Sequence, residues 1–106
     1  MRTENLVRKE DLCSKEEQTV SNHWIYRFPN NYGASVVKVT RPAYDGPLVY
    51  EVTVICFIGD TNNAYEVMMD EVGVLHGYFD EKGVDRFLKK ISRTNFWEVE
   101  VFSLVG

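Results

Sequence analysis

The fold is decided by the stretch Leu48-Val49-Tyr50-Glu51-Val52-Thr53-Val54-Ile55-Cys56-Phe57-Ile58. Alternate residues of a strand point to opposite faces of a sheet. One face of this stretch carries Leu48, Tyr50, Val52, Val54, Cys56 and Ile58. The other face, with Val49, Ile55 and Phe57, is also largely apolar, which is typical of a strand that is covered on both sides. We therefore expect this stretch to be the central strand of a sheet.

Two alternating runs precede the central strand, at residues 23–28 and 34–41. They are separated by Pro29-Asn30-Asn31-Tyr32-Gly33, and asparagine and glycine tolerate the positive φ angles of tight turns. A proline- and glycine-containing loop at residues 42–47 then leads into the central strand. The three strands are predicted to form an antiparallel meander.

The second half of the chain predicts a helix that packs on this sheet. Residues 64–69 are predicted as a fourth strand, and residues 70–76 either continue it or form a loop. Asp80 is placed to cap a helix, because an apolar stripe at helical spacing follows it. That stripe is Val84, Phe87, Leu88 and Ile91. Residues 96–102 alternate again and predict a last strand.

The chain of 106 residues is long enough for one modest core and too short for two domains. Residues 1–19 carry too few apolar side chains for a core-facing stripe and are predicted to be a charged N-terminal arm or a short helix. Residues 20–106 are predicted to be a single α+β domain. Its antiparallel sheet has about four to five strands, and one helix from the C-terminal half packs on it.

Several classes of protein are disfavoured by the sequence. The longest apolar run has about half the length of a membrane-spanning helix, and the start of the chain has no secretory pattern. Cys13 and Cys56 lie far apart and lack a metal-binding spacing, so we expect unpaired thiols. We therefore expect a cytoplasmic protein without a membrane segment.

Charge is distributed unevenly along the chain. Between Arg41 and Lys82 there is no lysine or arginine, and this segment holds eight of the sixteen acidic residues. The rest of the chain carries all twelve basic residues and is mildly basic. An acidic middle disfavours direct binding of nucleic acid there and allows a basic protein surface as a partner.

Candidate catalytic groups are few. The only histidines are His23 and His76, and neither belongs to a metal-ligand motif. A calcium loop starting at Asp60 is rejected, because Tyr65 stands where such a loop needs glycine. Glu98 and Glu100 are expected to form a solvated strand edge. The prediction is a protein that is not an enzyme, with no catalytic residues, metal site or cofactor; the alternative is a small metal-dependent hydrolase that uses His76 with nearby carboxylates.

One motif resembles a family of small bacteriophage and prophage proteins. Their motif, of the form Arg-Phe-x-Asn-Gly-Tyr-Gly-Ala-Ser-Val-Val, is similar to Arg27-Phe28-Pro29-Asn30-Asn31-Tyr32-Gly33-Ala34-Ser35-Val36-Val37. A Leu-Tyr-Glu-Leu strand and a Gly-aromatic-Leu-Thr-Glu-Glu helix start follow in that family. They are comparable with Leu48-Val49-Tyr50-Glu51-Val52 and Gly77-Tyr78-Phe79-Asp80-Glu81. The chain departs from the motif at Asn31, where the family usually has glycine, and it inserts residues between the strand and the helix.

The resemblance, which covers residues 26–91, implies a protein that acts in the cytoplasm of an infected bacterium. Together with the acidic middle it leads to the hypothesis of an anti-CRISPR-type inhibitor that docks an acidic surface on a host nucleic-acid-binding defence protein. The predicted partner-binding residues are Asp45, Asp60, Glu66, Asp70, Glu71, Tyr32 and Tyr44. The other alternative is a structural or regulatory phage protein that forms a homodimer through an exposed strand edge.

Overall fold

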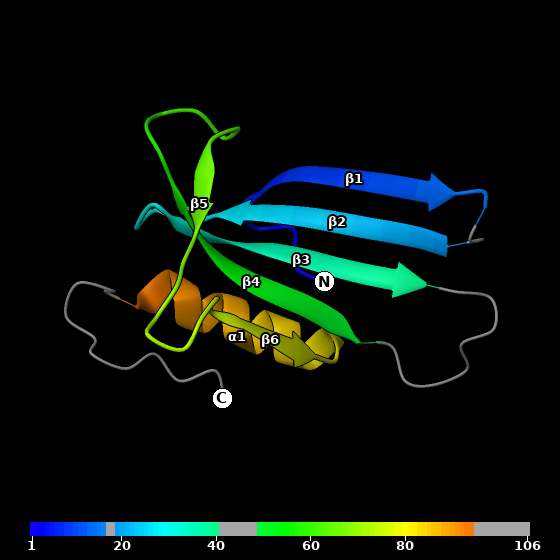
Figure 1. Cartoon of the computed structure of the whole chain (residues 1–106). Helices are drawn as coiled ribbons and strands as arrows, with labels where there is room; N and C mark the ends of the chain where they lie inside the picture. The colour runs from blue at the N-terminus through cyan, green and yellow to red at the C-terminus, as the bar shows by residue number, and fades with distance from the viewer. Residues whose placement is uncertain (17–18, 41–48, 95–106) are drawn as a thin grey trace.

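The computed structural model describes residues 1–16, 19–40 and 49–94, which form one antiparallel sheet with a single helix packed on it (Figure 1). The strands are β1 (Leu6–Ser14), β2 (Thr19–Arg27), β3 (Tyr32–Thr40), β4 (Tyr50–Phe57), β5 (Tyr65–Val67) and β6 (His76–Phe79), followed by α1 (Glu81–Arg93). Along the sheet the order is β1-β2-β3-β4-β5, and β6 also pairs with β4. The predicted α+β fold with one helix on an antiparallel sheet is confirmed.

Strand β4 is the centre of the sheet, as its sequence predicts. It pairs with β3 on one side and with both β5 and β6 on the other. Tyr50, Val52 and Val54 are buried on the helix-facing side, and Ile55 and Phe57 are buried on the opposite face. The strand is shorter than predicted, because Gly59 turns the chain with a φ of 70° and leaves Ile58 half exposed.

The turn between β2 and β3 has the geometry that its asparagines predict. Asn31 adopts a φ of 69°. The backbone N–H of Phe28 donates to the carbonyl of Tyr32 over 2.8 Å, and that of Asn31 donates to the carbonyl of Phe28 over 3.0 Å. Strands β2, β3 and β4 therefore form the predicted antiparallel meander.

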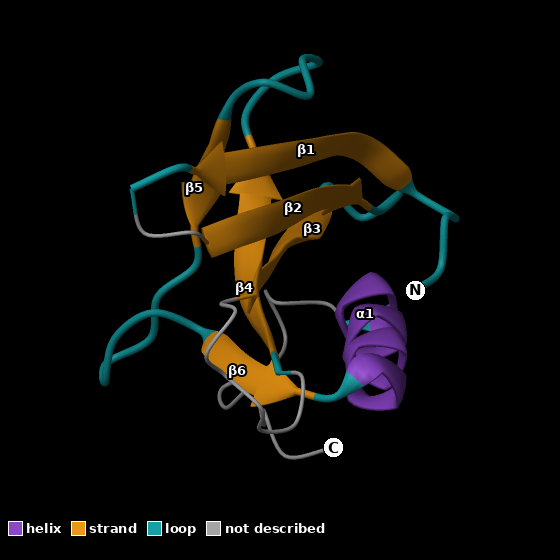
Figure 2. Ribbon diagram, turned by 90° about the vertical axis from the view of Figure 1, so that its right-hand side faces the viewer, coloured by secondary structure: helices purple, strands orange, loops and turns teal. Residues whose placement is uncertain are grey.

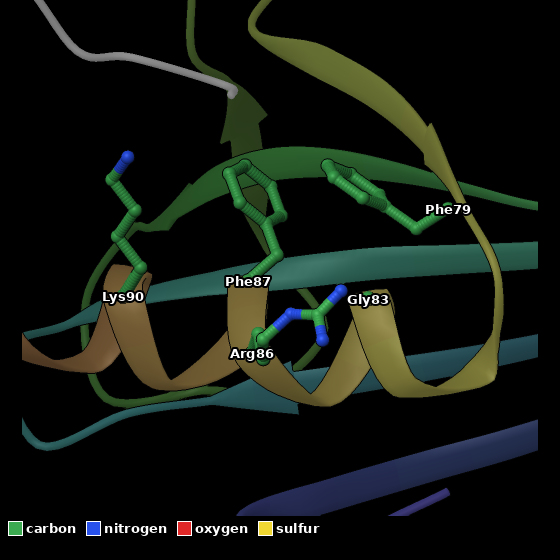
Figure 3. A pocket seen from close by; sticks show the side chains of 5 residues that line it. All are labelled: Phe79, Gly83, Arg86, Phe87 and Lys90. Carbon is green, nitrogen blue, oxygen red and sulfur yellow. The ribbon is translucent and has the colours of Figure 1, made fainter. Parts of the chain in front are cut away.

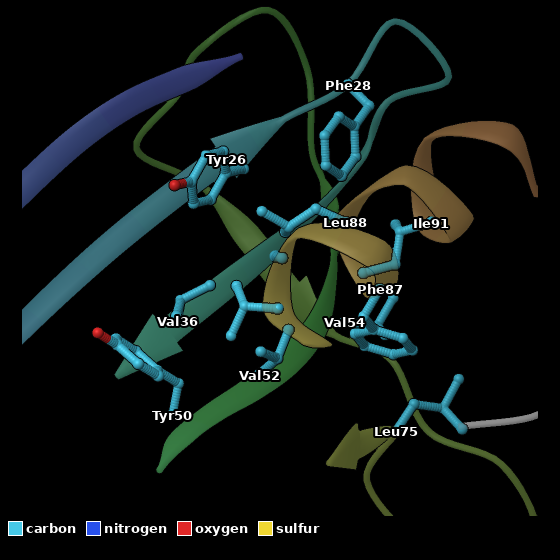
Figure 4. Close-up of a cluster of buried hydrophobic side chains, with 12 residues drawn as sticks. Tyr26, Phe28, Val36, Tyr50, Val52, Val54, Leu75, Phe87, Leu88 and Ile91 are labelled. Carbon is cyan, nitrogen blue, oxygen red and sulfur yellow. The ribbon is translucent and has the colours of Figure 1, made fainter. Parts of the chain in front are cut away.

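Helix α1 covers one face of the sheet and closes the main core (Figures 2 and 4). Asp80 caps it, since its Oδ1 accepts a hydrogen bond of 2.7 Å from the backbone N–H of Gly83. The predicted stripe is buried and packs against β3, β4 and β6. The core around it consists of Tyr26, Phe28, Ala34, Val36, Tyr50, Val52, Val54, Leu75, Val84, Phe87, Leu88 and Ile91.

The prediction of a charged arm or short helix over residues 1–19 is wrong, because β1 pairs antiparallel with β2 over Leu6–Ser14. An edge strand is held by hydrogen bonds to one neighbour and does not require a continuous apolar face. The lack of an apolar stripe in residues 1–19 is therefore compatible with a strand. The sequence also does not predict strand β6, because its four residues before the helix cap are too few to show a clear alternation. Both thiols are unpaired, as expected.

Two predicted elements lie outside the described residues. These are the loop at residues 42–47 and the last strand at residues 96–102, which includes Glu98 and Glu100. Within the described ranges, no helix has the length and apolar character needed to cross a membrane.

Candidate functional site

The outer edge of β4 is shared by two short strands, and the chain leaves the sheet between them. Strand β6 pairs with the first half of β4 and β5 with the second half. The switch occurs at Val54, whose N–H donates to the carbonyl of Leu75 and whose carbonyl accepts from the N–H of Met68, both over 2.9 Å. Residues 68–75 therefore form a small hairpin that projects from the sheet edge (Figures 1 and 2), and we call it the finger.

The finger has a defined structure of its own. Met69 and Val74 form a β-bridge, and the N–H of Asp70 donates to the carbonyl of Gly73 over 2.8 Å. The Oδ1 atom of Asp70 accepts hydrogen bonds from the N–H groups of Val72 and Gly73, at 2.8 and 3.0 Å. Gly73 has a φ of 148°, which side chains rarely permit. The tip is thus a turn closed by the Asp70 carboxylate.

The finger places apolar side chains in solvent. Val72 at the tip is 96% exposed and Met69 is 66% exposed. Val74 and the neighbouring Val67 of β5 are also exposed, whereas the base of the finger is anchored because Leu75 is buried and Met68 packs against the core. Clustered exposed apolar side chains on an ordered projection are typical of a surface that contacts another molecule.

Three of the predicted acidic residues come together at this finger. Asp70 and Glu71 lie in its tip, and Glu66 lies in β5 just before it; all three are exposed. Because the Asp70 carboxylate closes the turn, Glu66 and Glu71 are the exposed acids that are better placed to meet a partner. Glu51 lies at the start of β4, where its carboxylate accepts a hydrogen bond from the Tyr78 hydroxyl and raises the pKa of that phenol.

Asp60 lies in a second projection, the turn of residues 58–63 between β4 and β5. Arg27 holds this turn: its guanidinium donates to the carbonyls of Gly59 and Thr61, at 3.0 and 3.1 Å, and to Oδ1 of Asn62 at 3.0 Å. The same guanidinium lies 4.8 Å from the centroid of the Phe57 ring. Asp60 is exposed on this turn, which is separate from the finger.

The predicted tyrosines do not join this surface in the described structure. Tyr32 is partly buried against the main core beside Cys56, and burial raises the pKa of its phenol. Tyr44 and Asp45 lie outside the described residues. Of the residues predicted to bind a partner, the structure thus brings together only Glu66, Asp70 and Glu71 at the finger, beside the exposed apolar residues Met69 and Val72.

The histidines lie on opposite sides of β4 in the strand order. The His23 ring lies 2.7 Å from the Ser35 hydroxyl, measured from Nε2 to Oγ, and burial lowers the pKa of this imidazole. His76 in β6 contacts the ring of Tyr78 edge to face, with centroids 5.7 Å apart. Within residues 1–16, 19–40 and 49–94, no three or more His, Cys, Asp or Glu side chains are grouped so that they could hold a metal ion.

The described surface includes two hollows that lie away from the finger. One, of 210 Å³, is lined by Phe79, Gly83, Arg86, Phe87 and Lys90 (Figure 3). It is smaller than the usual small-molecule site of about 300–1,000 Å³. The rings of Phe79 and Phe87 stack at 4.9 Å beside it, so it is a gap at the edge of the core. The other, of 460 Å³, lies over β1, β2 and β3.

Comparison of the chain with models of protein families, with curated proteins and with solved structures finds no match in any of the three.

Proposed function

We propose that this protein is a non-enzymatic binding module that docks the finger on a basic protein. The observation that carries the proposal is the tip of the finger, where Val72 is 96% exposed on an ordered turn that also bears Asp70 and Glu71. Within the described structure this tip makes no contact with the core. An exposed apolar side chain on a preorganised turn can enter a partner's pocket at little conformational cost.

The charges around the finger favour a basic partner. No lysine or arginine occurs between Arg41 and Lys82, so no base within that segment neutralises Glu66 or Glu71. Lysines and arginines that bind phosphates would attract these carboxylates for the same electrostatic reason. Burial of Val72 and Met69 would then supply about 1.5–3 kcal/mol each.

A nucleic-acid-binding protein fits both properties, and the resemblance to small phage proteins makes a host defence protein of the CRISPR type the first partner to test. A protein of this kind would lose its DNA or RNA site to the finger. The proposed place of action is the cytoplasm of the bacterial host.

The test uses the tagged protein in bacteria that carry CRISPR and other defence systems, and identifies captured proteins by mass. The captured protein should be lost with the double variant Met69→Ser/Val72→Ser and with Glu66→Lys/Glu71→Lys. It should be retained with Val20→Ser, a matched change of an exposed valine on β2. The purified protein should also displace nucleic acid from that partner, and the double serine variant should not.

Two substitutions of Asp70 distinguish the effect of its charge from its role in closing the turn. Asp70→Asn keeps an oxygen that can accept the N–H groups of Val72 and Gly73, whereas Asp70→Ala removes it. We expect weaker binding with Asp70→Ala than with Asp70→Asn. A partner that is captured equally by wild type and by both finger variants would contradict the proposal.

Self-association through a strand edge is the weaker candidate. Among the described strands β1 pairs only with β2, and none of them occupies its other edge. That strand carries Arg8, Lys9, Glu10 and Asp11 in succession, and charged edges are a common way to prevent pairing between sheets. A dimer mass in solution that Val72→Ser does not change would favour this candidate.

A further inference from the structure

The groove of 460 Å³ lies on the helix-bearing side of the sheet and is independent of the finger. Helix α1 packs on β3, β4 and β6 and leaves part of β1 and β2 uncovered. The groove is lined mainly by Arg2, Lys9, Asn22, Trp24, Lys38 and Tyr50. Strands β1, β2 and β3 lie on the opposite side of β4 from β5 and the finger.

Two aromatic rings form the floor of the groove, and the ammonium group of a lysine lies over each ring. The rings of Trp24 and Tyr50 have centroids 6.0 Å apart and are tilted by 52°. Nζ of Lys9 lies 5.8 Å from the centroid of Trp24, and Nζ of Lys38 lies 5.8 Å from that of Tyr50. The strand register explains this, because Lys9 is opposite Trp24 and Lys38 is opposite Tyr50 on neighbouring strands.

Neither lysine has an acidic partner in direct contact among residues 1–16, 19–40 and 49–94. Within the described residues, no carboxylate lies within 4.0 Å of either ammonium group. Glu81 also lines the groove, and its carboxylate accepts a hydrogen bond of 2.8 Å from the N-terminal amine. Arg2 forms an ion pair with Glu4 at 2.8 Å. The hydrogen bond from the N-terminal amine lowers the pKa of Glu81, and the charge of Lys38 adds to this lowering from a greater distance. In the described part of the chain, the groove therefore presents two ammonium groups that lie over aromatic rings and have no direct carboxylate partner.

We propose that this groove binds a nucleotide, with its phosphate on Lys9 and Lys38 and its base on Trp24. Phosphate oxygens form charge-assisted hydrogen bonds with ammonium groups that are stronger than a contact with a ring face. Movement of Lys9 to the phosphate uncovers the Trp24 ring, which a base can then stack on. The volume lies in the range of small-molecule sites. A free nucleotide and a nucleotide within a single strand share this chemistry.

The test measures tryptophan fluorescence in a Trp97→Phe variant, in which Trp24 is the only tryptophan. Adenosine monophosphate and a short single-stranded oligodeoxyadenylate are titrated separately, each against adenosine and inorganic phosphate as controls. We expect saturable quenching by at least one of the two nucleotide ligands. Saturation by the monophosphate shows that a free nucleotide suffices, and saturation by the oligonucleotide alone identifies the strand as the source.

Lysine variants decide whether the groove is the site. Lys9→Met and Lys38→Met should each weaken the binding of the ligand that quenches the fluorescence by about tenfold or more. Lys89→Met, on the exposed face of α1, should leave the affinity unchanged. Both groove variants keep the aliphatic stem, and their unfolding midpoints are compared with the parent. Absence of saturable quenching by both ligands would overturn the proposal, as would equal affinity in the Lys9, Lys38 and Lys89 variants.

Discussion

Asn31 and Phe57 are joined by two hydrogen bonds that tie the β2–β3 turn to the end of β4. Nδ2 of Asn31 donates to the Phe57 carbonyl over 2.9 Å, and the Phe57 N–H donates to the Asn31 carbonyl over 3.0 Å. Oδ1 of Asn31 accepts from the Arg27 guanidinium over 2.6 Å. The asparagine thus does more than permit a positive φ, since its side chain links the end of β2 to the end of β4.

Replacement of Asn31 separates these two roles. Asn31→Ala removes the side-chain hydrogen bonds and leaves an ordinary side chain at a φ of 69°, so we expect a loss of about 1–3 kcal/mol in the free energy of unfolding. Asn31→Gly loses the same hydrogen bonds without the backbone strain and should cost less. Urea unfolding of the three proteins measures this. Equal losses in both variants would show that the φ angle carries no cost.

The cap of α1 gives a second prediction. Asp80→Ala removes the acceptor of the Gly83 N–H and should lower the free energy of unfolding by about 1 kcal/mol. Asp80→Asn keeps an acceptor oxygen at that place and should lose much less. The comparison is made by urea unfolding, and an unchanged stability of Asp80→Ala would rule out the cap as a stabilising contact.

Tyr26 predicts the behaviour of the protein at high pH. Its ring is fully buried, its hydroxyl donates to the Arg2 carbonyl over 2.7 Å, and burial raises the pKa of the phenol to about 12. Between the usual value near 10 and this value the folded state holds a proton that the unfolded state has lost. Stability should therefore fall as the pH rises through this window, by up to about 1.4 kcal/mol per pH unit.

The Tyr26→Phe variant isolates this contribution. It should lack that part of the alkaline loss, although it is less stable at neutral pH by about 1 kcal/mol because the hydrogen bond is gone. Denaturant unfolding at several alkaline pH values measures the difference between the two proteins. A difference that stays constant with pH would mean that Tyr26 ionises normally.

The lowered pKa of His23 predicts a loss of stability at acidic pH. Burial lowers the pKa of its imidazole below 6.5, with Arg8 acting in the same direction and Glu10 against it. The unfolded state then binds a proton more readily, so stability should be full above about pH 6.5 and decline as the pH falls below it. His23→Gln should remove this decline when unfolding is followed at several acidic pH values. An identical pH profile for both proteins would contradict the assignment.

Substitutions at the tip of the finger should have little effect on the stability of the fold. Val72 is almost fully exposed, so Val72→Ser is expected to change the free energy of unfolding by less than about 0.5 kcal/mol. Leu75→Ala, at the buried base of the same hairpin, should cost about 2–5 kcal/mol. If both changes destabilise equally in urea unfolding, the tip is part of the core and is not available to a partner.

Local patterns sufficed for the elements whose signals lie close together in the chain. The two apolar faces of β4, the asparagine turn and the capped helix each follow from side-chain alternation, tolerance of positive φ, or helical spacing within about a dozen residues. The fold class followed from them. Strand β1 is not predictable in this way, because its side chains show no apolar stripe and its place in the sheet depends on hydrogen bonds to β2.

Both proposed sites depend on tertiary structure. The acidity of the middle segment can be read from the sequence, but the change of partner strand at Val54 is what projects Asp70, Glu71 and Val72 from the sheet edge. In the same way, only strand register places Lys9 on Trp24 and Lys38 on Tyr50. Residue types and their spacing determined the individual elements, whereas pairing between distant segments decided which side chains meet, because strand register is set by contacts that no local pattern encodes.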